Sequence, residues 1–204
     1  MIEFINLHKS FGQQRVLNGI NLTIPHGQIT AIIGQSGSGK SVLIKHLVAL
    51  IRPDSGQVLV DGAELGQLHG KALDLVREKF GVLFQGGALF DSMTLFDNVA
   101  FPLREKTRLA EAEIAKRAIQ RLEAVGLADM GHKYPAELSG GMKKRAALAR
   151  ALVQDPQIIL FDEPTTGLDP ILLNSIHRLI LDSHKRFGFT AVVVSHEIPE
   201  IFDI

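Results

Sequence analysis

A glycine-rich loop near the N-terminus has the residue types needed to hold phosphate groups. Residues 34–41 match the pattern G-x-x-x-x-G-K-[ST], and they are Gly34, Gln35, Ser36, Gly37, Ser38, Gly39, Lys40 and Ser41. The glycines let main-chain N–H groups approach phosphate oxygens closely. The ammonium of Lys40 suits the β- and γ-phosphates, and the Ser41 hydroxyl suits Mg²⁺. The loop therefore predicts a bound nucleoside triphosphate.

The flanking segments favour a phosphate site over a chance glycine-rich turn. Residues 28–33 predict a short buried strand, and apolar residues recur after the loop at helical spacing, at Val42, Leu43, Leu47 and Leu50. The phosphates would then lie at a helix N-terminus, where the helix dipole is positive.

Two carboxylates and a glycine pair could supply further chemistry. Asp162 and Glu163 end the apolar run 158–161, so a buried strand would bring Asp162 to Mg²⁺ and leave Glu163 to polarise a water. Plain acidic residues at a strand end are the alternative. Ser139, Gly140 and Gly141 begin an alanine-rich helix and could form a second anion site, or only cap the helix. The cations at 143–145 oppose the helix dipole, which leaves a nearby anion and a solvated basic face both open.

The order of elements predicts an α/β fold with a largely parallel, helix-covered sheet. Strands are predicted at residues 3–7, 20–24, 57–60, 80–84, 158–161 and 191–194, with an insertion between Gln85 and Gln157 that is mostly helical. Its apolar stripe ends at Gly126, a candidate C-cap, and further helices are predicted at 142–154 and 171–180. We expect one domain over 1–204, with a core of 1–88 and 156–204 and a helical subdomain of 89–155.

Composition narrows the class of protein. The 46% of hydrophobic residues can bury a substantial core, and a formal net charge of +0 gives no reason to expect a nucleic-acid partner. The chain has no cysteine for disulfides or thiolate metal sites, no apolar run long enough to cross a bilayer, and no signal-peptide pattern. These features predict a soluble, cytosolic type of chain.

In motif order, nearly the whole chain resembles the ATPase subunit of an ABC transporter, a P-loop NTPase with a RecA-like core, an N-terminal antiparallel β part and an inserted helical subdomain. The matching residues are Phe11 for the adenine-stacking aromatic, 34–41 for Walker A, Gln85 for the Q-loop, 139–141 for the signature, Asp162 and Glu163 for Walker B, Gly167, Leu168 and Asp169 for the D-loop, and His196 for the switch histidine. The resemblance implies ATP as ligand and Ser41, Gln85 and Asp162 around Mg²⁺. It implies catalytic roles for Lys40, Gln85, Glu163 and His196.

The resemblance also implies partners. The P-loop of one copy would face the signature and Asp169 of a second copy in a head-to-tail dimer, and a separate permease would form the path through the membrane. The chain would then lie on the cytoplasmic face of the inner membrane. Three departures stand out: Met142 replaces the usual glutamine, Phe11 replaces the more frequent tyrosine, and the chain ends at Ile204, short of further strands expected in the family.

Segments around Gln85 resemble one branch of the family, the ATPases of the Mla phospholipid system and its MCE-protein relatives. The matching segments are residues 84–90, 96–105, 139–142, 145–150 and 195–200. They imply phospholipid transport, an MCE-domain protein and a small regulatory subunit. An amino-acid or other small-solute importer remains the first alternative, which a copurifying solute-binding protein would support. A second alternative is a non-transport ABC ATPase acting on DNA or ribosomes, which nucleic-acid-stimulated hydrolysis would support. A third is a P-loop kinase, which a phosphorylated product would support.

Overall fold

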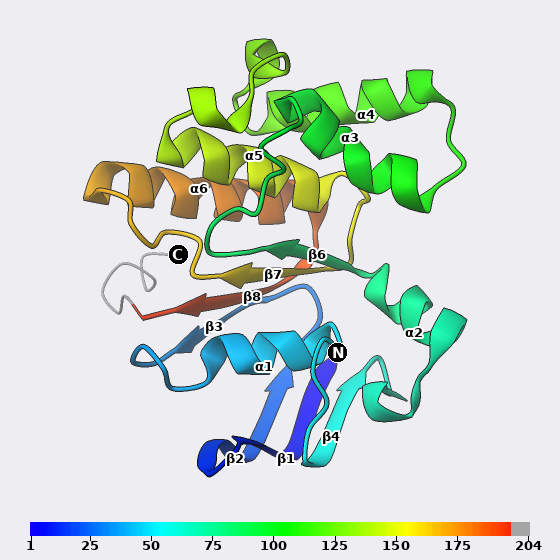
Figure 1. Ribbon diagram of the computed structural model, residues 1–204, viewed down its shortest axis with the longest axis vertical. Coiled ribbons are helices and arrows are strands. Elements are labelled where there is room, and N and C mark those ends of the chain that lie inside the picture. The colour runs from blue at the N-terminus through cyan, green and yellow to red at the C-terminus, as the bar shows by residue number, and fades with distance from the viewer. Residues whose placement is uncertain (197–204) are drawn as a thin grey trace.

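Two four-stranded sheets and a layer of helices make up residues 1–196, the part of the chain that this computed structural model describes (Figure 1). The antiparallel sheet has the order β2-β1-β4-β5, with β1 at Ile2–Phe11, β2 at Gln14–Ile24, β4 at Ser55–Val60 and β5 at Ala63–Glu64. The parallel sheet has the order β3-β8-β7-β6, with β3 at Ile29–Ile33, β8 at Thr190–Ser195, β7 at Ile158–Asp162 and β6 at Phe80–Leu83. The prediction of a parallel core with an antiparallel N-terminal part is confirmed.

Helix α1, Lys40–Leu47, lies between the two sheets (Figure 1). Its buried leucine and isoleucine side chains share one apolar cluster with β1, β4 and one face of β7 and β8. Strand β7 contributes alternate residues to two cores, because successive side chains of a strand point to opposite faces. Ile158 and Leu160 face α1, whereas Ile159 and Phe161 face the helical layer.

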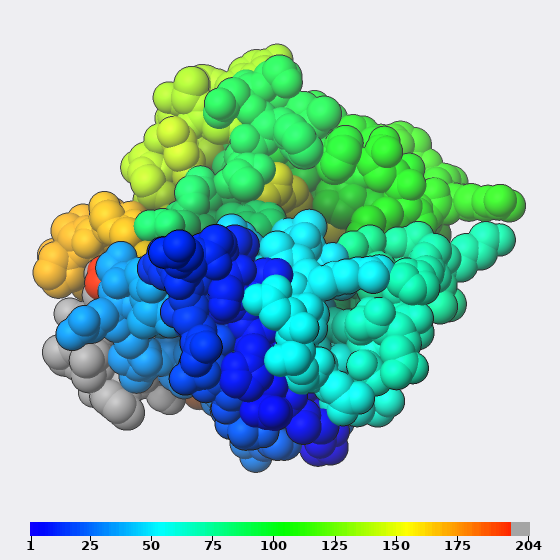
Figure 2. Space-filling model, turned by 60° about the horizontal axis from the view of Figure 1, so that its bottom comes forward, coloured from blue at the N-terminus to red at the C-terminus, as the bar shows by residue number. Residues whose placement is uncertain are grey.

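The helical layer covers the other face of the parallel sheet. It contains α3 at Leu95–Lys106, α4 at Glu111–Ala124, α5 at Gly140–Leu152 and α6 at Pro170–Phe187. Short 3₁₀ turns at Ala128–Met130 and Pro135–Glu137 connect α4 to α5, and a third at Leu65–Gln67 precedes α2 at Gly70–Arg77. In the view of Figure 2, the antiparallel strands, blue to cyan, form one side of the molecule and the helical layer, green to orange, forms the other.

Several predictions about local structure need correction. The helix after the glycine-rich loop ends at Leu47, so Leu50 lies outside it and is 60% exposed. Strand β3 is half-buried, with Ala31 exposed, because it pairs only with β8 among the described residues. At the end of α4 the C-cap prediction is close: Val125 is the cap, and Gly126 follows it with a φ of 72° in the left-handed region.

Candidate functional site

The glycine-rich loop joins the end of β3 to the start of α1. Gly39 precedes the helix with a φ of 96°, which favours glycine. A Cβ atom there would lie 2.9 Å from Val16 Cγ1, so space as well as conformation excludes a side chain. The N-terminus of α1 is thereby left open to a ligand.

Lys40 places its ammonium inside this loop. Its Nζ donates to the main-chain oxygens of Gly34, at 2.7 Å, and Gln35, at 2.9 Å. The residue is 7% exposed, and Glu163 Oε1 lies 3.9 Å from the ammonium. A buried cation is stable only with such partners, so Lys40 is held at one position.

Ser41 and Asp162 meet although 121 positions separate them in the chain. The Ser41 hydroxyl donates to Asp162 Oδ1 at 2.8 Å, because α1 begins where β7 ends. A hydroxyl beside a carboxylate offers hard oxygen ligands of the kind Mg²⁺ prefers. Residues 1–196 contain no group of three or more His, Cys, Asp or Glu side chains that could hold a metal ion. Mg²⁺ is usually bound by one or two carboxylates together with substrate phosphates and water, and the Ser41–Asp162 pair fits that pattern.

Glu163 lies at the centre of the charged groups. It has a φ of 50°, an uncommon conformation for a residue with a side chain, while its N–H donates to Val194 O at 3.0 Å. Its Oε1 lies 3.2 Å from His196 Nδ1, and its Oε2 accepts from the Thr166 hydroxyl at 3.1 Å. The side chain is only 13% exposed, so the carboxylate is oriented from several sides.

These residues surround one hollow of about 310 Å³, the P-loop pocket. Its lining comes from four separated parts of the chain, namely Phe11, Val16, Ser36, Gly37, Gly39, Lys40, Ser41, Val42, Gln85 and Glu163. Phe11 lines the pocket with a ring that is 49% exposed, and the Lys9 ammonium lies 5.6 Å from the centre of that ring. Residues predicted from distant motifs therefore line a common cavity.

The start of α5 lines a different hollow. Ser139 is the N-cap of α5, and its hydroxyl accepts from Met142 N at 3.3 Å. Ser139 and Gly141 border a space of about 280 Å³ together with Leu172, and none of its lining residues belongs to the P-loop pocket. Asp169 similarly caps α6 by accepting from two main-chain N–H groups at 3.0 Å. Within one copy, the structure does not bring residues 139–141 or Asp169 to the P-loop pocket.

The cations at 143–145 have a different explanation from the two left open by the sequence. Lys144 donates to the main-chain oxygen of Gln85, and Arg145 donates to Ser175 Oγ at 2.7 Å and to Val125 O at 3.3 Å. Two of the three cations therefore bind neutral oxygens of neighbouring segments. Their presence is no evidence of an anion near the start of α5.

Sequence reasoning missed three residues that hold the loop after β6, namely Asn98, Lys144 and Arg150. Asn98 is fully buried and bonds to main-chain groups of residues 90, 93 and 94. Arg150 donates to Gly87 O and Ala88 O, both at 2.7 Å. Because these side chains bond to main-chain atoms, the residue types in the loop give no sequence signal from which the contacts could be predicted.

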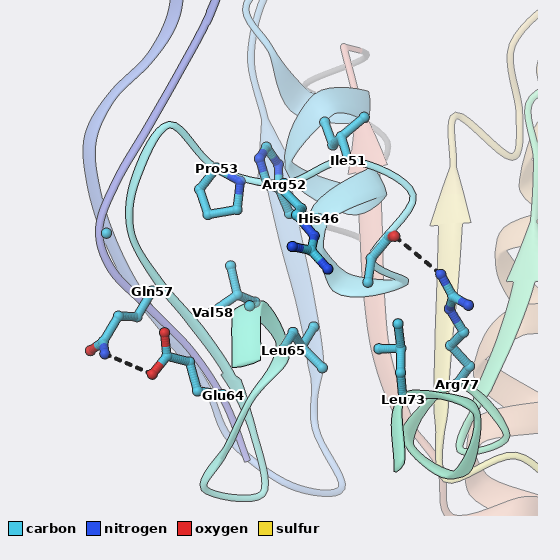
Figure 3. Close-up of a pocket in the computed structure, with 13 residues that line it drawn as sticks. His46, Ile51, Arg52, Pro53, Gln57, Val58, Glu64, Leu65, Leu73 and Arg77 are labelled. Atoms are coloured by element: carbon cyan, nitrogen blue, oxygen red, sulfur yellow. Dashed lines mark hydrogen bonds between the residues drawn. The ribbon is translucent and has the colours of Figure 1, made fainter. Parts of the chain in front are cut away.

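A further cavity, of about 180 Å³, lies between α1, β4, β5 and α2 (Figure 3). Two of its polar side chains have partners within the lining: Gln57 donates to Glu64 at 2.9 Å, and Arg77 donates to Ala49 O at 3.1 Å. It shares no residue with the P-loop pocket. This cavity is therefore separate from the candidate site.

Two expectations from the sequence, the segment at 195–200 and the lack of a membrane-spanning run, can be compared with only part of the structure. The Mla-like segment at 195–200 includes Glu197, Ile198, Pro199 and Glu200, which lie outside the described residues. In the part that is described, no helix combines the length and apolar character needed to cross a membrane.

Comparisons with known proteins identify relatives of the whole chain. The family model described as ABC transporter matches residues 17–166, and an AAA domain model matches the shorter segment 134–203. The chain is 49% identical over 197 residues to "Probable ribonucleotide transport ATP-binding protein mkl" of Mycobacterium tuberculosis, covering 97% of this chain and 55% of that protein. It is 45% identical over 204 residues to the intermembrane phospholipid transport system ATP-binding protein MlaF of Haemophilus influenzae, covering 100% and 77%. The chain thus spans about half the length of its mycobacterial relatives.

A solved structure agrees with the sequence relatives. The ATP-binding cassette MJ0796, determined as a dimer in a post-hydrolysis state bound to ADP and Pi, has a TM-score of 0.88 and 34% sequence identity, covering 98% of this chain and 90% of that one. The architecture, the motifs and these matches agree over nearly all of the sequence. The chain belongs to the ABC transporter family, as one of its ATP-binding cassettes.

Proposed function

We propose that this chain binds ATP with Mg²⁺ in the P-loop pocket and hydrolyses it. The observation that carries the proposal is the meeting of Ser41 and Asp162 beside the buried ammonium of Lys40. Ser41 and Asp162, with Gln85 from the pocket wall, would hold the metal ion. When bound, Mg²⁺ would neutralise charge on the β- and γ-phosphates. Lys40 and the N–H groups of residues 34–39 would hold the phosphates, and Phe11 would stack on adenine.

Glu163 is our candidate for the general base. Its carboxylate would accept a proton from the attacking water, while Lys40 and His196 beside it limit the directions in which it can turn. His196 and Gln85 would contact the γ-phosphate and the water. These contacts would orient the reacting groups, which is the main contribution of a protein to phosphoryl transfer.

A second copy of the chain would complete the site. In one copy, none of residues 139–141 lines the P-loop pocket, and Ser139 and Gly141 border a different hollow, so a phosphate bound in that pocket lacks the signature. A head-to-tail dimer would bring the signature and Asp169 of one copy to the P-loop of the other. The dimeric form of MJ0796 supports this arrangement.

Removing the P-loop ammonium tests the proposal. We expect Lys40→Ala to abolish ATP binding in calorimetry, because it removes the cation that faces the phosphates. Lys45→Ala is the matched control, since Lys45 is an exposed lysine of the same helix. Equal ATP affinity of Lys40→Ala and the wild type would exclude the proposed site.

We further propose that ATP hydrolysis drives phospholipid transport through a separate permease, with an MCE-domain protein and a small regulatory subunit as further partners. The likeness to MlaF, whose name states intermembrane phospholipid transport, supports this cargo. Residues 89–155 would act as a helical subdomain on a core formed by 1–88 and 156–204. The complex would place the chain at the cytoplasmic face of the inner membrane.

An aromatic groove is the candidate binding site for the permease. It is a hollow of about 460 Å³ beside β6 and α3, and its exposed members include Phe84 and Phe90. Lys106 and Arg150 add positive charge to its lining. An amphipathic helix with apolar anchors and an acidic flank would fit such a surface.

Copurification tests the choice of cargo. We expect the tagged chain to bring down a membrane permease and an MCE-domain protein, and the reconstituted complex to move labelled phospholipid between vesicles when ATP is present. The name of the mycobacterial relative favours ribonucleotide as the second candidate cargo. Uptake of labelled ribonucleotide without lipid movement would select that candidate, whereas a solute-binding protein among the copurified partners would indicate a small-solute importer.

A further inference from the structure

The turn that carries Gln85 is held by side chains of α5. Residues 84–87 form this turn, here called the Q-turn, which is closed by a bond from Gly87 N to Phe84 O at 2.8 Å. Lys144 Nζ donates to the main-chain oxygen of Gln85. Arg150, farther along α5, donates to Gly87 O and Ala88 O. Main-chain oxygens of three of the four residues 85–88 thus accept from one helix.

Lys144 has an environment that is costly for a free cation. The residue is 7% exposed, and burial lowers the pKa of its ammonium, while the carboxylates of Glu163 and Asp162 raise it in opposition. A buried ammonium needs a strong acceptor, and a charge-assisted bond to a carbonyl oxygen is such an interaction. The Gln85 oxygen and the Lys144 ammonium therefore fix each other.

We propose that Lys144 is a positioning residue that sets the place of Gln85 in the P-loop pocket. Lys144 holds the main chain of Gln85 and leaves its side chain to line the pocket. Without this bond the turn can shift relative to the phosphates, and a displacement of about 1 Å is enough to slow catalysis greatly. The inference rests on the proposed ATPase function and on the role of Gln85 in it.

Steady-state hydrolysis by the purified protein tests this role. We expect Lys144→Met to lower kcat by about 10- to 10²-fold, because the pocket is no longer pre-organised. The KM for ATP should stay within about twofold, because Lys40 and the P-loop are unchanged. Lys144→Arg should restore most of the rate, since arginine can donate to the same oxygen. Lys143→Met is the control and should match the wild type, because Lys143 is only half-buried and has no bond to the Q-turn among the described residues.

Amide hydrogen exchange provides a readout that is independent of activity. We expect residues 84–88 to exchange faster in Lys144→Met than in Lys143→Met, with the rest of the core unchanged. A wild-type kcat in Lys144→Met, a loss that Lys144→Arg does not restore, or unchanged exchange in the Q-turn would overturn the inference. If wild type and Lys40→Ala hydrolyse ATP equally, the proposed function fails by itself, and the exchange experiment still decides whether Lys144 holds the turn.

Discussion

Asn98 should be among the most sensitive polar residues of this fold. Its side chain is fully buried at the start of α3, and among residues 1–196 its bonds go to main-chain atoms. It accepts from Phe90 N at 2.8 Å and donates to the oxygens of Phe90, Met93 and Thr94 at 3.0 to 3.2 Å. We therefore expect Asn98→Ala to destabilise the protein and to loosen the loop between the Q-turn and α3.

The loss of stability in Asn98→Ala depends on which main-chain groups would be left without a hydrogen-bond partner. Phe90 O also accepts from Met93 N, and Thr94 O also accepts from Asn98 N, so both keep a partner in the alanine variant. Phe90 N and Met93 O lose the bond that the structure shows. At about 1–3 kcal/mol for each unsatisfied group, the free energy of unfolding should fall by about 3 kcal/mol. For a chain of this size that corresponds to a Tm lower by about 6–12 °C.

Urea denaturation followed by circular dichroism would measure this change. Asn18→Ala is the matched control, because Asn18 is an exposed asparagine of β2, and its effect should stay within about 0.5 kcal/mol. Asn98→Asp gives a second test: the carboxylate keeps the acceptor for Phe90 N but faces carbonyl oxygens. It should destabilise at neutral pH at least as much as alanine. A loss below about 1 kcal/mol in Asn98→Ala would refute the assignment of unsatisfied groups.

Three further predictions concern catalysis, pH dependence and backbone conformation. Glu163→Gln should keep ATP binding, lose turnover and accumulate a closed dimer in size-exclusion chromatography with ATP, and normal hydrolysis would remove Glu163 from the base role. Burial raises the pKa of Asp61, but bonds from Lys79 and the N-terminal ammonium outweigh it and lower the pKa to about 2. Because the pKa of Asp61 is lower in the folded protein, its ion pair with Lys79 stabilises the protein above the ordinary pKa of 3.8, and this stabilisation is lost as the pH falls through about 2. The Tm difference between wild type and Lys79→Met should therefore shrink over that pH interval. A constant Tm difference would contradict the ion pair. Gly56→Ala would bring a Cβ to 2.2 Å from a main-chain oxygen of β1 and should lower the free energy of unfolding by more than about 3 kcal/mol. Gly62→Ala has open space and a similar positive φ, and should lower it by about 1–2 kcal/mol. Equal Tm values for the two variants would show that the backbone relieves the clash.

The parts of the fold that sequence could predict are those whose signals are local. The P-loop is a run of adjacent residues, and the apolar run before Asp162 is a strand by composition alone. Assigning both Ser41 and Asp162 to one metal ion predicted that they lie close together, and the structure has them in contact. Their roles in binding and hydrolysis stay predictions until variants are measured.

The parts that sequence could not predict depend on pairing between distant segments. The apolar pattern predicts a strand that ends at residue 7, but β1 continues through polar residues to Phe11. It does so because these residues pair with β2, up to the pair Phe11–Gln14. Helix α2 has only 8 residues and no side-chain cap, yet Arg77 at its end donates to Val48 O and Ala49 O after α1. Tertiary contacts of this kind override weak local preferences.

Helix α5 makes the position of the signature and that of Gln85 depend on each other. Its N-cap is Ser139. Lys144 and Arg150 both hold the Q-turn, and Arg150 also donates to Ala88 O and lines the aromatic groove. A helix of 13 residues moves as a unit, because its main-chain bonds resist local bending. A partner that displaces α5 from the groove therefore displaces the main chain of Gln85 as well, unless the bonds of Lys144 and Arg150 break. Breaking them would leave a buried ammonium and several carbonyl oxygens without partners, so movement of α5 together with the Q-turn is the lower-energy response.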